Sequence, residues 1–507
     1  MKTVLFKCSL AALTIAFAMA FTGCEKEDTV PDEGKLLTVV NSRVATMNSI
    51  DAFWMWTGMA AYVPGCQAWL DPVVSKFLEG NPIVEKKYVI WEGKAPVGNE
   101  KVPASGIVLG KKSIFEGKEK AKGVILYNHG TQFAQIETPS GGFDINGLFA
   151  LDGFVVVAAD YYGFGATQNR PQAYLAYYNA VTALELLSAA VRDFGLQGIP
   201  QYVCGHSEGG MTSAAVAQEW SANGSAYPDV ELTRVYAVNG PYDIHHTFSE
   251  FRDLDYAPGI IGGLALASIS YNMILGEDLY KNFVDLVKNN NGENRAQKYL
   301  TSGDYGNYGS PLVFGEYYGM PNAQNALETG ILTDEALKEL TTPGLDYGTF
   351  PGFSRWGKLS HLFDIDVLNE QLPKYKEKFN LCDKPFAYKC PFVIWNSTED
   401  VMVQDYNSDP LFENASGDIT YITGNMGDHV ASAYYFIQYF IEEITGKKFQ
   451  ENYVGHTYCN NNPHEEAFDC QNKKFYNTLD PANKDYIYDL NSTDNYTRVV
   501  KTKNKQQ

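Results

Sequence analysis

Short apolar runs alternate along this chain with longer helical segments, and this alternation constrains the fold more than any other feature of the sequence. The runs are continuous and rich in Val and Ile, as expected for strands that are buried on both faces of a parallel sheet. They lie at residues 124–127, 154–159, 201–204 and 234–238, with helical patterns at 173–194 and 211–220. Elements in this order predict an α/β fold, with a mostly parallel central sheet flanked by helices.

The alternation stops after residue 244 and resumes near residue 390, where apolar runs at 392–395 and 419–422 precede a helical pattern at 430–444. An insertion of this length between two strands is typical of a cap over the sheet. Within it, residues 257–275 carry no charge. Pro, Gly and polar side chains make this stretch weakly hydrophobic. We therefore expect a buried pair of helices in a large, mainly helical cap rather than a membrane span, with an acyl-binding surface as the alternative.

The N-terminus has the pattern of an export signal. Lys2 and Lys7 precede an apolar stretch at residues 10–21, and Cys24 follows directly after a glycine. A basic start and a short apolar region are typical of a secretory signal peptide rather than a membrane span. The Cys resembles the lipidated residue of a bacterial lipoprotein, and the acidic residues 25–28 resemble a signal for the outer face of the outer membrane. We expect an exported chain with a lipid anchor on Cys24 in the outer membrane, and plain secretion is the alternative.

These observations divide the chain into six expected parts. They are a signal peptide at 1–23, a flexible tether at 24–39, the first part of an α/β core at 40–244, a cap at 245–389, the second part of the core at 390–450, and a polar C-terminal extension at 451–507.

Charge and the positions of the cysteines indicate which partners, metals and disulfides to expect. The formal net charge is −20, which repels phosphate backbones, so we expect no nucleic-acid partner. No His/Cys spacing is typical of a zinc site, so we expect no metal. Export permits disulfides, and the reasonable local pairs are Cys382 with Cys390 and Cys459 with Cys470. Cys204 lies in an apolar run and is predicted to be a buried free thiol.

The sequence G-H-S-E-G at residues 205–209 follows the apolar run 201–204 and opens the next helical pattern. A Ser hydroxyl is a weak nucleophile and must be held out of its secondary structure, next to a base. A G-x-S-x-G turn between strand and helix does this, and its glycines relieve crowding around the strained Ser backbone. The pattern predicts Ser207 as a nucleophile on an elbow formed with Gly205 and Gly209.

An acid and a base follow in the order that such a nucleophile requires. Asp400 lies just past the apolar run 392–395, where a carboxylate that orients the base is expected, and Glu399 is the alternative. His429 lies between the run 419–422 and the last helical pattern. A His at this point can reach both Ser207 and Asp400, take the hydroxyl proton, and be held in the correct tautomer.

An oxyanion hole needs two backbone N–H groups directed at the developing negative charge. One is expected from Glu208, directly after the nucleophile. The other is expected from the loop after the run 124–127, where Thr131 is the predicted donor and Gln132 the alternative. His129 in this loop is predicted to be a packing residue rather than a base.

These segments resemble the α/β-hydrolase superfamily, and specifically its secreted lipases and esterases with a large cap. The likeness covers about residues 88–444. It is carried by N-H-G at 128–130, D-Y-Y-G-F-G at 160–165, Y-L at 174–175, the elbow at 205–210, G-P-Y-D at 240–243, Asp400 and His429. The cap shows little likeness to that branch, so the choice of substrate does not carry over.

The resemblance implies a serine hydrolase that transfers an acyl group to water through an acyl-enzyme. No metal or organic cofactor is expected. The expected substrate is a small-molecule, lipid or acylated-glycan ester, and a serine peptidase of the same fold is the first alternative. The second alternative is a surface binding lipoprotein that has lost activity, although Ser207 and His429 are both in place.

Overall fold

The structure is a computed structural model, and it describes the parts of the chain from which the core is built. The described residues are 35–45, 84–98, 100–132, 138–141, 146–168, 170, 174–247, 380–400, 402–427, 429–446, 468–469, 474–476, 486–489 and 498–503. The expected signal peptide, Cys24 and the helix pair expected at 257–275 in the cap lie outside these residues.

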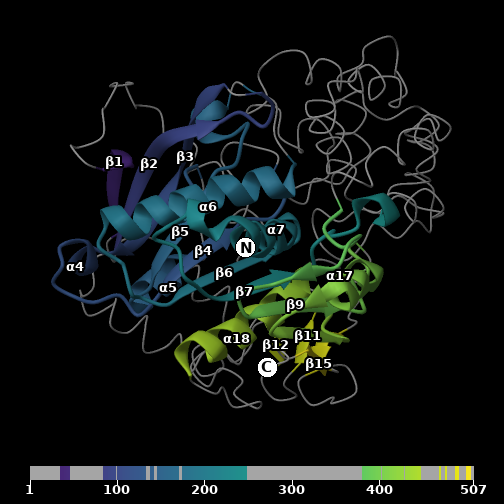
Figure 1. Cartoon of the computed structure of the whole chain (residues 1–507). Coiled ribbons are helices and arrows are strands. Elements are labelled where there is room, and N and C mark those ends of the chain that lie inside the picture. Colours follow the sequence, from purple (N-terminus) through teal and green to yellow (C-terminus); the bar gives the residue numbers. More distant parts are fainter. Residues whose placement is uncertain are drawn as a thin grey trace, which may run out of the picture.

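A ten-stranded sheet forms the centre of the molecule (Figure 1), with the order β1-β2-β3-β5-β4-β6-β7-β9-β11-β15 among the described residues. Its strands are β1 (Thr38–Ala45), β2 (Val84–Lys94), β3 (Lys101–Lys111), β4 (Val124–Asn128), β5 (Val155–Ala159), β6 (Gln201–His206), β7 (Leu232–Val238), β9 (Phe392–Ser397), β11 (Ile419–Gly424) and β15 (Val499–Lys503).

The central strands are parallel, and the outer strands are antiparallel. Parallel pairing joins β5, β4, β6, β7, β9 and β11 in a continuous ladder. The strands β1, β2 and β3 on one side and β15 on the other run antiparallel to their neighbours. Because the carboxyl ends of parallel strands meet at one edge of a sheet, the segments after β4, β6, β9 and β11 lie at the same edge.

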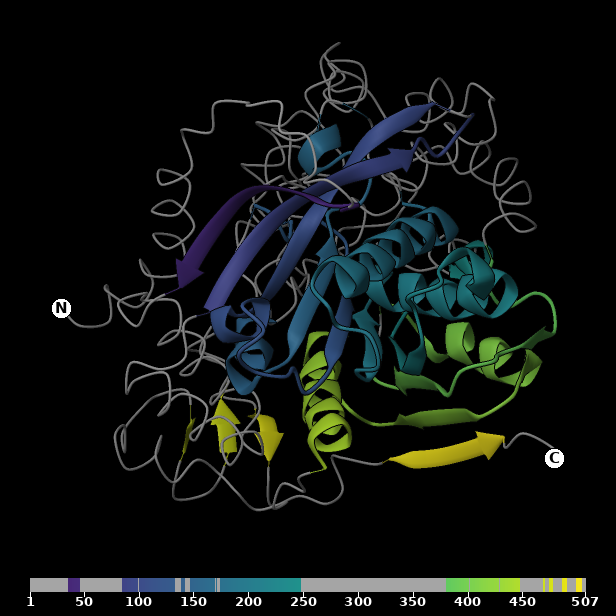
Figure 2. The same cartoon turned by 60° about the vertical axis from the view of Figure 1, so that its left-hand side comes forward.

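Helices cover both faces of this sheet. α6 (Ala176–Asp193) and α7 (Glu208–Asn223) pack side by side on one face (Figure 2), and α5 (Asn146–Asp152) and α18 (His429–Thr445) pack on the other. Along β5, Val155 and Val157 face the first layer, and Val156 faces the second. Each fully buried Val stabilises the fold by about 1.5–3 kcal/mol, so the continuous apolar runs are explained by burial on both faces.

The remaining elements are short. They are α4 (Lys112–Phe115), α17 (Ser408–Asn414), the 3₁₀ turns Gly165–Thr167, Gly224–Ala226 and Asp405–Asn407, a parallel pair of β8 (Phe386–Ala387) with β10 (Ala415–Ser416), and a small sheet of β12 (Phe468–Asp469), β13 (Lys474–Tyr476) and β14 (Tyr486–Asp489). No helix in the described part of the chain is both long and apolar enough to cross a membrane.

The cysteines correct one sequence-based expectation. Cys382 and Cys390 are both thiols and do not form a disulfide pair. The two thiols have separate surroundings. The Cys382 thiol donates to the Tyr242 carbonyl at 3.5 Å, beyond β7. Burial raises the pKa of Cys390 to about 12, although a hydrogen bond with Ser221 of α7 opposes this rise. Cys204 is buried and forms no disulfide, as predicted. Cys459 and Cys470 lie outside the described residues.

Candidate active site

The turn between β6 and α7 holds Ser207 in a backbone conformation that side chains rarely adopt. Ser207 has φ 62° and ψ −126°, a strained combination that is found mostly at functional sites. Its N–H donates to the carbonyl of Val238 at 2.9 Å, and its own carbonyl accepts from Met211 at 3.0 Å. The side chain is 8% exposed. β7 and α7 therefore fix the strained turn from both sides.

Glycine is required on both sides of Ser207 because other backbone segments approach closely. A Cβ at Gly205 would lie 2.3 Å from the carbonyl oxygen of Gly209. A Cβ at Gly209 would lie 2.0 Å from the carbonyl oxygen of Asn128 at the end of β4. These distances are far below a van der Waals contact, so β4, β6 and the first turn of α7 can pack this closely only without side chains at these positions.

Asp400 and His429 form a buried hydrogen-bonded pair at the same edge of the sheet. His429 Nδ1 and Asp400 Oδ2 are 2.6 Å apart. Asp400 Oδ1 also accepts from the backbone N–H groups of Met402 and Val403, both at 2.9 Å. Burial alone would raise the pKa of Asp400, but His429 and these donors outweigh it and lower the pKa below its usual value. The structure thus places Asp400 against His429, whereas Glu399 is exposed.

His429 lies beside the turn that carries Ser207. The ring of His206, the residue before Ser207, is centred 4.4 Å from the ring of His429. Burial, and then His429, lower the pKa of His206 to about 3, so that His206 stays neutral near pH 7. Three segments that are distant in sequence are therefore brought together, and the role of His206 as a neutral neighbour of His429 was not expected from the sequence.

The loop after β4 passes next to the nucleophile turn. A Cβ at Gly130 would lie 3.8 Å from the Cβ of Ser207, which places the following residue, Thr131, near the turn. The His129 ring packs against Tyr161 in a tilted arrangement, with 3.9 Å between ring centres, and its Nδ1 lies 2.8 Å from the Gly130 carbonyl. Burial lowers the pKa of His129 to about 4. His129 is thus buried and neutral at pH 7.

The side chain of Glu208 was overlooked in the sequence, where only its backbone N–H was given a role. Glu208 is 4% exposed, and burial raises the pKa of its carboxyl group to about 8. Asn179 of α6 donates to its Oε1 at 3.4 Å. Tyr161 and Tyr174 are also close to it, and the pKa of each is raised by burial first and by Glu208 second. The only signal in the sequence is its position directly after the nucleophile.

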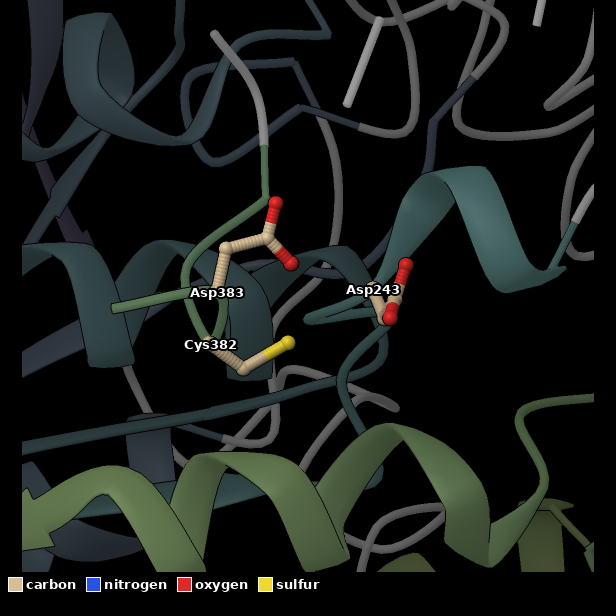
Figure 3. A group of neighbouring side chains, drawn as sticks. All are labelled: Asp243, Cys382 and Asp383. Atoms are coloured by element: carbon tan, nitrogen blue, oxygen red, sulfur yellow. The ribbon is translucent and has the colours of Figure 1, made fainter. Parts of the chain in front are cut away.

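One group of potential metal ligands stands out among the described residues. The ligand atoms of Asp243, Cys382 and Asp383 lie within 4.8 Å of one another, and Figure 3 shows Cys382 and Asp383 on one loop and Asp243 on another segment. The side-chain amide of Asn380 donates to Asp243 at 2.8 Å and to Asp383 at 3.0 Å. This shared donor explains why the two carboxylates lie together, so the arrangement does not require a cation.

The fold has relatives among solved structures, although no protein-family model and no curated protein matches the sequence. One is a protein of Legionella pneumophila provisionally assigned as a hydrolase, with a TM-score of 0.50, 16% identity, and coverage of 72% of this chain and 89% of that chain. Another is the rice cell wall degrading esterase LipA from Xanthomonas oryzae in a ligand-bound form, with a TM-score of 0.50, 16% identity, and coverage of 82% and 98%. Such identities establish the fold alone. The chain has the α/β-hydrolase fold, which confirms the mostly parallel sheet and flanking helices predicted from the sequence. Most of the predicted cap, at 248–379, lies outside the described residues.

Proposed function

We propose that the protein is a serine hydrolase that cleaves carboxylic esters through an acyl-enzyme, with Ser207, His429 and Asp400 as its catalytic residues. The observation that carries this proposal is the buried pair of Asp400 and His429, with 2.6 Å between Oδ2 and Nδ1, beside the strained turn of Ser207. A nucleophile, a base and an acid that orients the base are the parts that this reaction needs.

In this proposal Ser207, His429 and Asp400 have separate roles. The Ser207 hydroxyl attacks the ester carbonyl while His429 Nε2 takes its proton, and the alcohol leaves with that proton. Asp400 accepts the hydrogen bond from Nδ1 and stabilises the imidazolium. The backbone N–H groups of Glu208 and Thr131 hold the oxyanion, with Gln132 as the alternative to Thr131. Water, deprotonated by His429, then releases the acid from Ser207, and the cycle needs no metal or organic cofactor.

The proposed substrates are small-molecule, lipid or acylated-glycan esters. The fold of this chain is similar to that of an esterase described as degrading the rice cell wall, which supports an ester substrate outside the cell. The lipid anchor on Cys24 belongs to the same proposal, because it would hold the enzyme at the outer membrane.

The test is the hydrolysis of p-nitrophenyl esters from acetyl to palmitoyl by the protein without residues 1–24. Ser207→Ala is expected to lower kcat/KM by at least about 10,000-fold, because the nucleophile is lost. Ser188→Ala is the matched control, since Ser188 lies on α6 and is also 8% exposed. Equal turnover by the Ser207→Ala variant would overturn the proposal. Cleavage of peptides but not of esters would show a peptidase instead.

A further inference from the structure

A buried chain of hydrogen bonds connects the core of the sheet to the acid and base. Trp395 Nε1 donates to Ser432 Oγ at 3.1 Å. Ser432 Oγ donates to Asn239 Oδ1 at 3.0 Å. The Asn239 amide nitrogen donates to Asp400 Oδ2, the same oxygen that accepts from His429. Trp395, Ser432 and Asn239 are all 0% exposed, so water does not compete for these bonds.

The donor and acceptor chemistry of these groups fixes the direction of each hydrogen bond from Trp395 to Asp400. An indole N–H can only donate, so Ser432 Oγ must accept from Trp395. The single hydroxyl hydrogen of Ser432 is then available for Asn239 Oδ1. An amide that accepts at its oxygen on this side presents its NH₂ group to the other side, where Asp400 lies. The assignment of the Asn239 oxygen and nitrogen therefore follows from the donor character of Trp395.

Three elements hold these groups in place. Trp395 belongs to β9, and Asn239 follows β7 with φ 44°, a left-handed conformation that Asn tolerates. The Asn239 N–H donates to the Trp395 carbonyl at 2.9 Å, so the two residues are joined through both backbone and side chains. Ser432 lies one helical turn after His429 on α18, which means that the same helix carries the base and the hydroxyl that orients Asn239.

We propose that Trp395 and Ser432 are positioning residues of the active site, which fix the Asn239 amide so that it donates to Asp400 and holds the carboxylate toward His429. Neither residue touches the reacting atoms. This inference rests on the proposed function for its kinetic consequence. The orientation of Asn239 can also be tested without turnover, through the protonation of His429.

Losing this orientation of Asn239 is expected to change the protonation of His429 in one direction only. An amide that donates to Oδ2 stabilises the negative charge of Asp400 and makes it a weaker partner for the imidazolium. An amide that is no longer held by Ser432 donates less well to Oδ2, and Asp400 would then favour protonated His429 more strongly. Within the part of the chain that the structure describes, the titratable side chains placed against His429 are Asp400 and the neutral His206. The pH at which His429 gains its proton is therefore expected to rise when Ser432 or Trp395 loses its hydrogen bond.

The experiment compares Ser432→Ala and Trp395→Phe with the unchanged protein. The midpoint of the His429 titration is followed by ¹⁵N-histidine NMR, with the signal assigned by its loss in His429→Gln. It is expected to rise by about half a pH unit in both variants. The acid limb of kcat/KM for p-nitrophenyl acetate is expected to move equally, and kcat to fall by roughly 10-fold with KM unchanged.

Two controls separate positioning from loss of structure. Ser432→Thr keeps the hydroxyl and is expected to restore the midpoint. Trp220→Phe removes an indole donor that also makes a 3.1 Å bond, to the Val230 carbonyl, and is expected to leave the midpoint unchanged. An unchanged midpoint in both Ser432→Ala and Trp395→Phe, or an equal shift in Trp220→Phe, would overturn the inference. If the unchanged protein shows no Ser207-dependent turnover, the proposed function fails, while the NMR midpoints still decide the orientation of Asn239.

Discussion

The carboxyl group of Glu208 lies in the core at the first position of α7, directly after the nucleophile. A helix N-terminus favours an anion, but burial has the larger effect here and raises the pKa to about 8. Glu208 is thus protonated near pH 7 and places no negative charge behind the proposed oxyanion hole. No pattern in the sequence shows this, because the environment of the side chain is made by Asn179, Tyr161 and Tyr174.

Glu208→Gln is expected to change how stability depends on pH. Between the usual Glu pKa of 4.5 and about 8, folded Glu208 keeps a proton that the unfolded chain releases. The free energy of unfolding therefore falls as pH rises through this window and is constant above it. Glu208→Gln does not have this pH dependence. As the pH rises from 5 to 8, its free energy of unfolding, measured by urea unfolding, should therefore increase by a few kcal/mol relative to that of the unchanged protein. The same pH dependence in both proteins would contradict this, and Glu219→Gln on the same helix is the control.

At the scale of elements, the apolar runs predicted the buried strands well and their ends less well. The run 201–204 became Gln201–His206, because Gly205 and His206 remain in the ladder beside β4 and β7. Order along the chain was enough to predict that Ser207, Asp400 and His429 lie at one edge of the sheet, since each follows a parallel strand. The links from Asn239 to Asp400 and from Ser432 to Asn239 depend on pairing between distant elements, and no local pattern indicates them.

The elbow glycine Gly209, in the first turn of α7, can be tested against Gly224, which follows the last residue of that helix. Gly209→Ala puts a methyl group 2.0 Å from the Asn128 carbonyl oxygen, so it is expected to reduce the free energy of unfolding by about 3 kcal/mol. At Gly224, the atoms nearest to a Cβ are side-chain atoms of Trp220, at 3.6 Å or more. Gly224→Ala should therefore be nearly neutral. Equal thermal stability of the two variants would contradict the close approach of β4 to the first turn of α7.

At the scale of the whole molecule, the first and last described strands of the chain form the two edges of the central sheet. β1 lies at one edge and β15 at the other. The backbone N–H groups of Leu36 and Leu37 donate to Asp193 at the end of α6, and Lys503 donates to the carbonyl groups of Phe412, Glu413 and Ala415. The sequence does not predict β15, because the segment 451–507 is polar. This strand has only two apolar residues, and it pairs with a strand that is distant in sequence.

The proposed anchor makes a prediction about location. Residues 25–37 connect Cys24 to β1, which begins at Thr38, and a chain of this length spans at most about 45 Å. Cys24→Ser is expected to move the protein from the membrane fraction to the soluble fraction of the cell, while its esterase activity is unchanged. Retention of the variant in the membrane fraction would exclude Cys24 as the anchor.

The central claim is that Ser207 is a nucleophile activated by His429. The most direct measurement is the mass of the protein after reaction with a fluorophosphonate, followed by mapping of the modified peptide. The account predicts one adduct on Ser207, formed at least about 1,000-fold more slowly in His429→Gln because the base is absent. No adduct on Ser207, or labelling at an equal rate without His429, would contradict it.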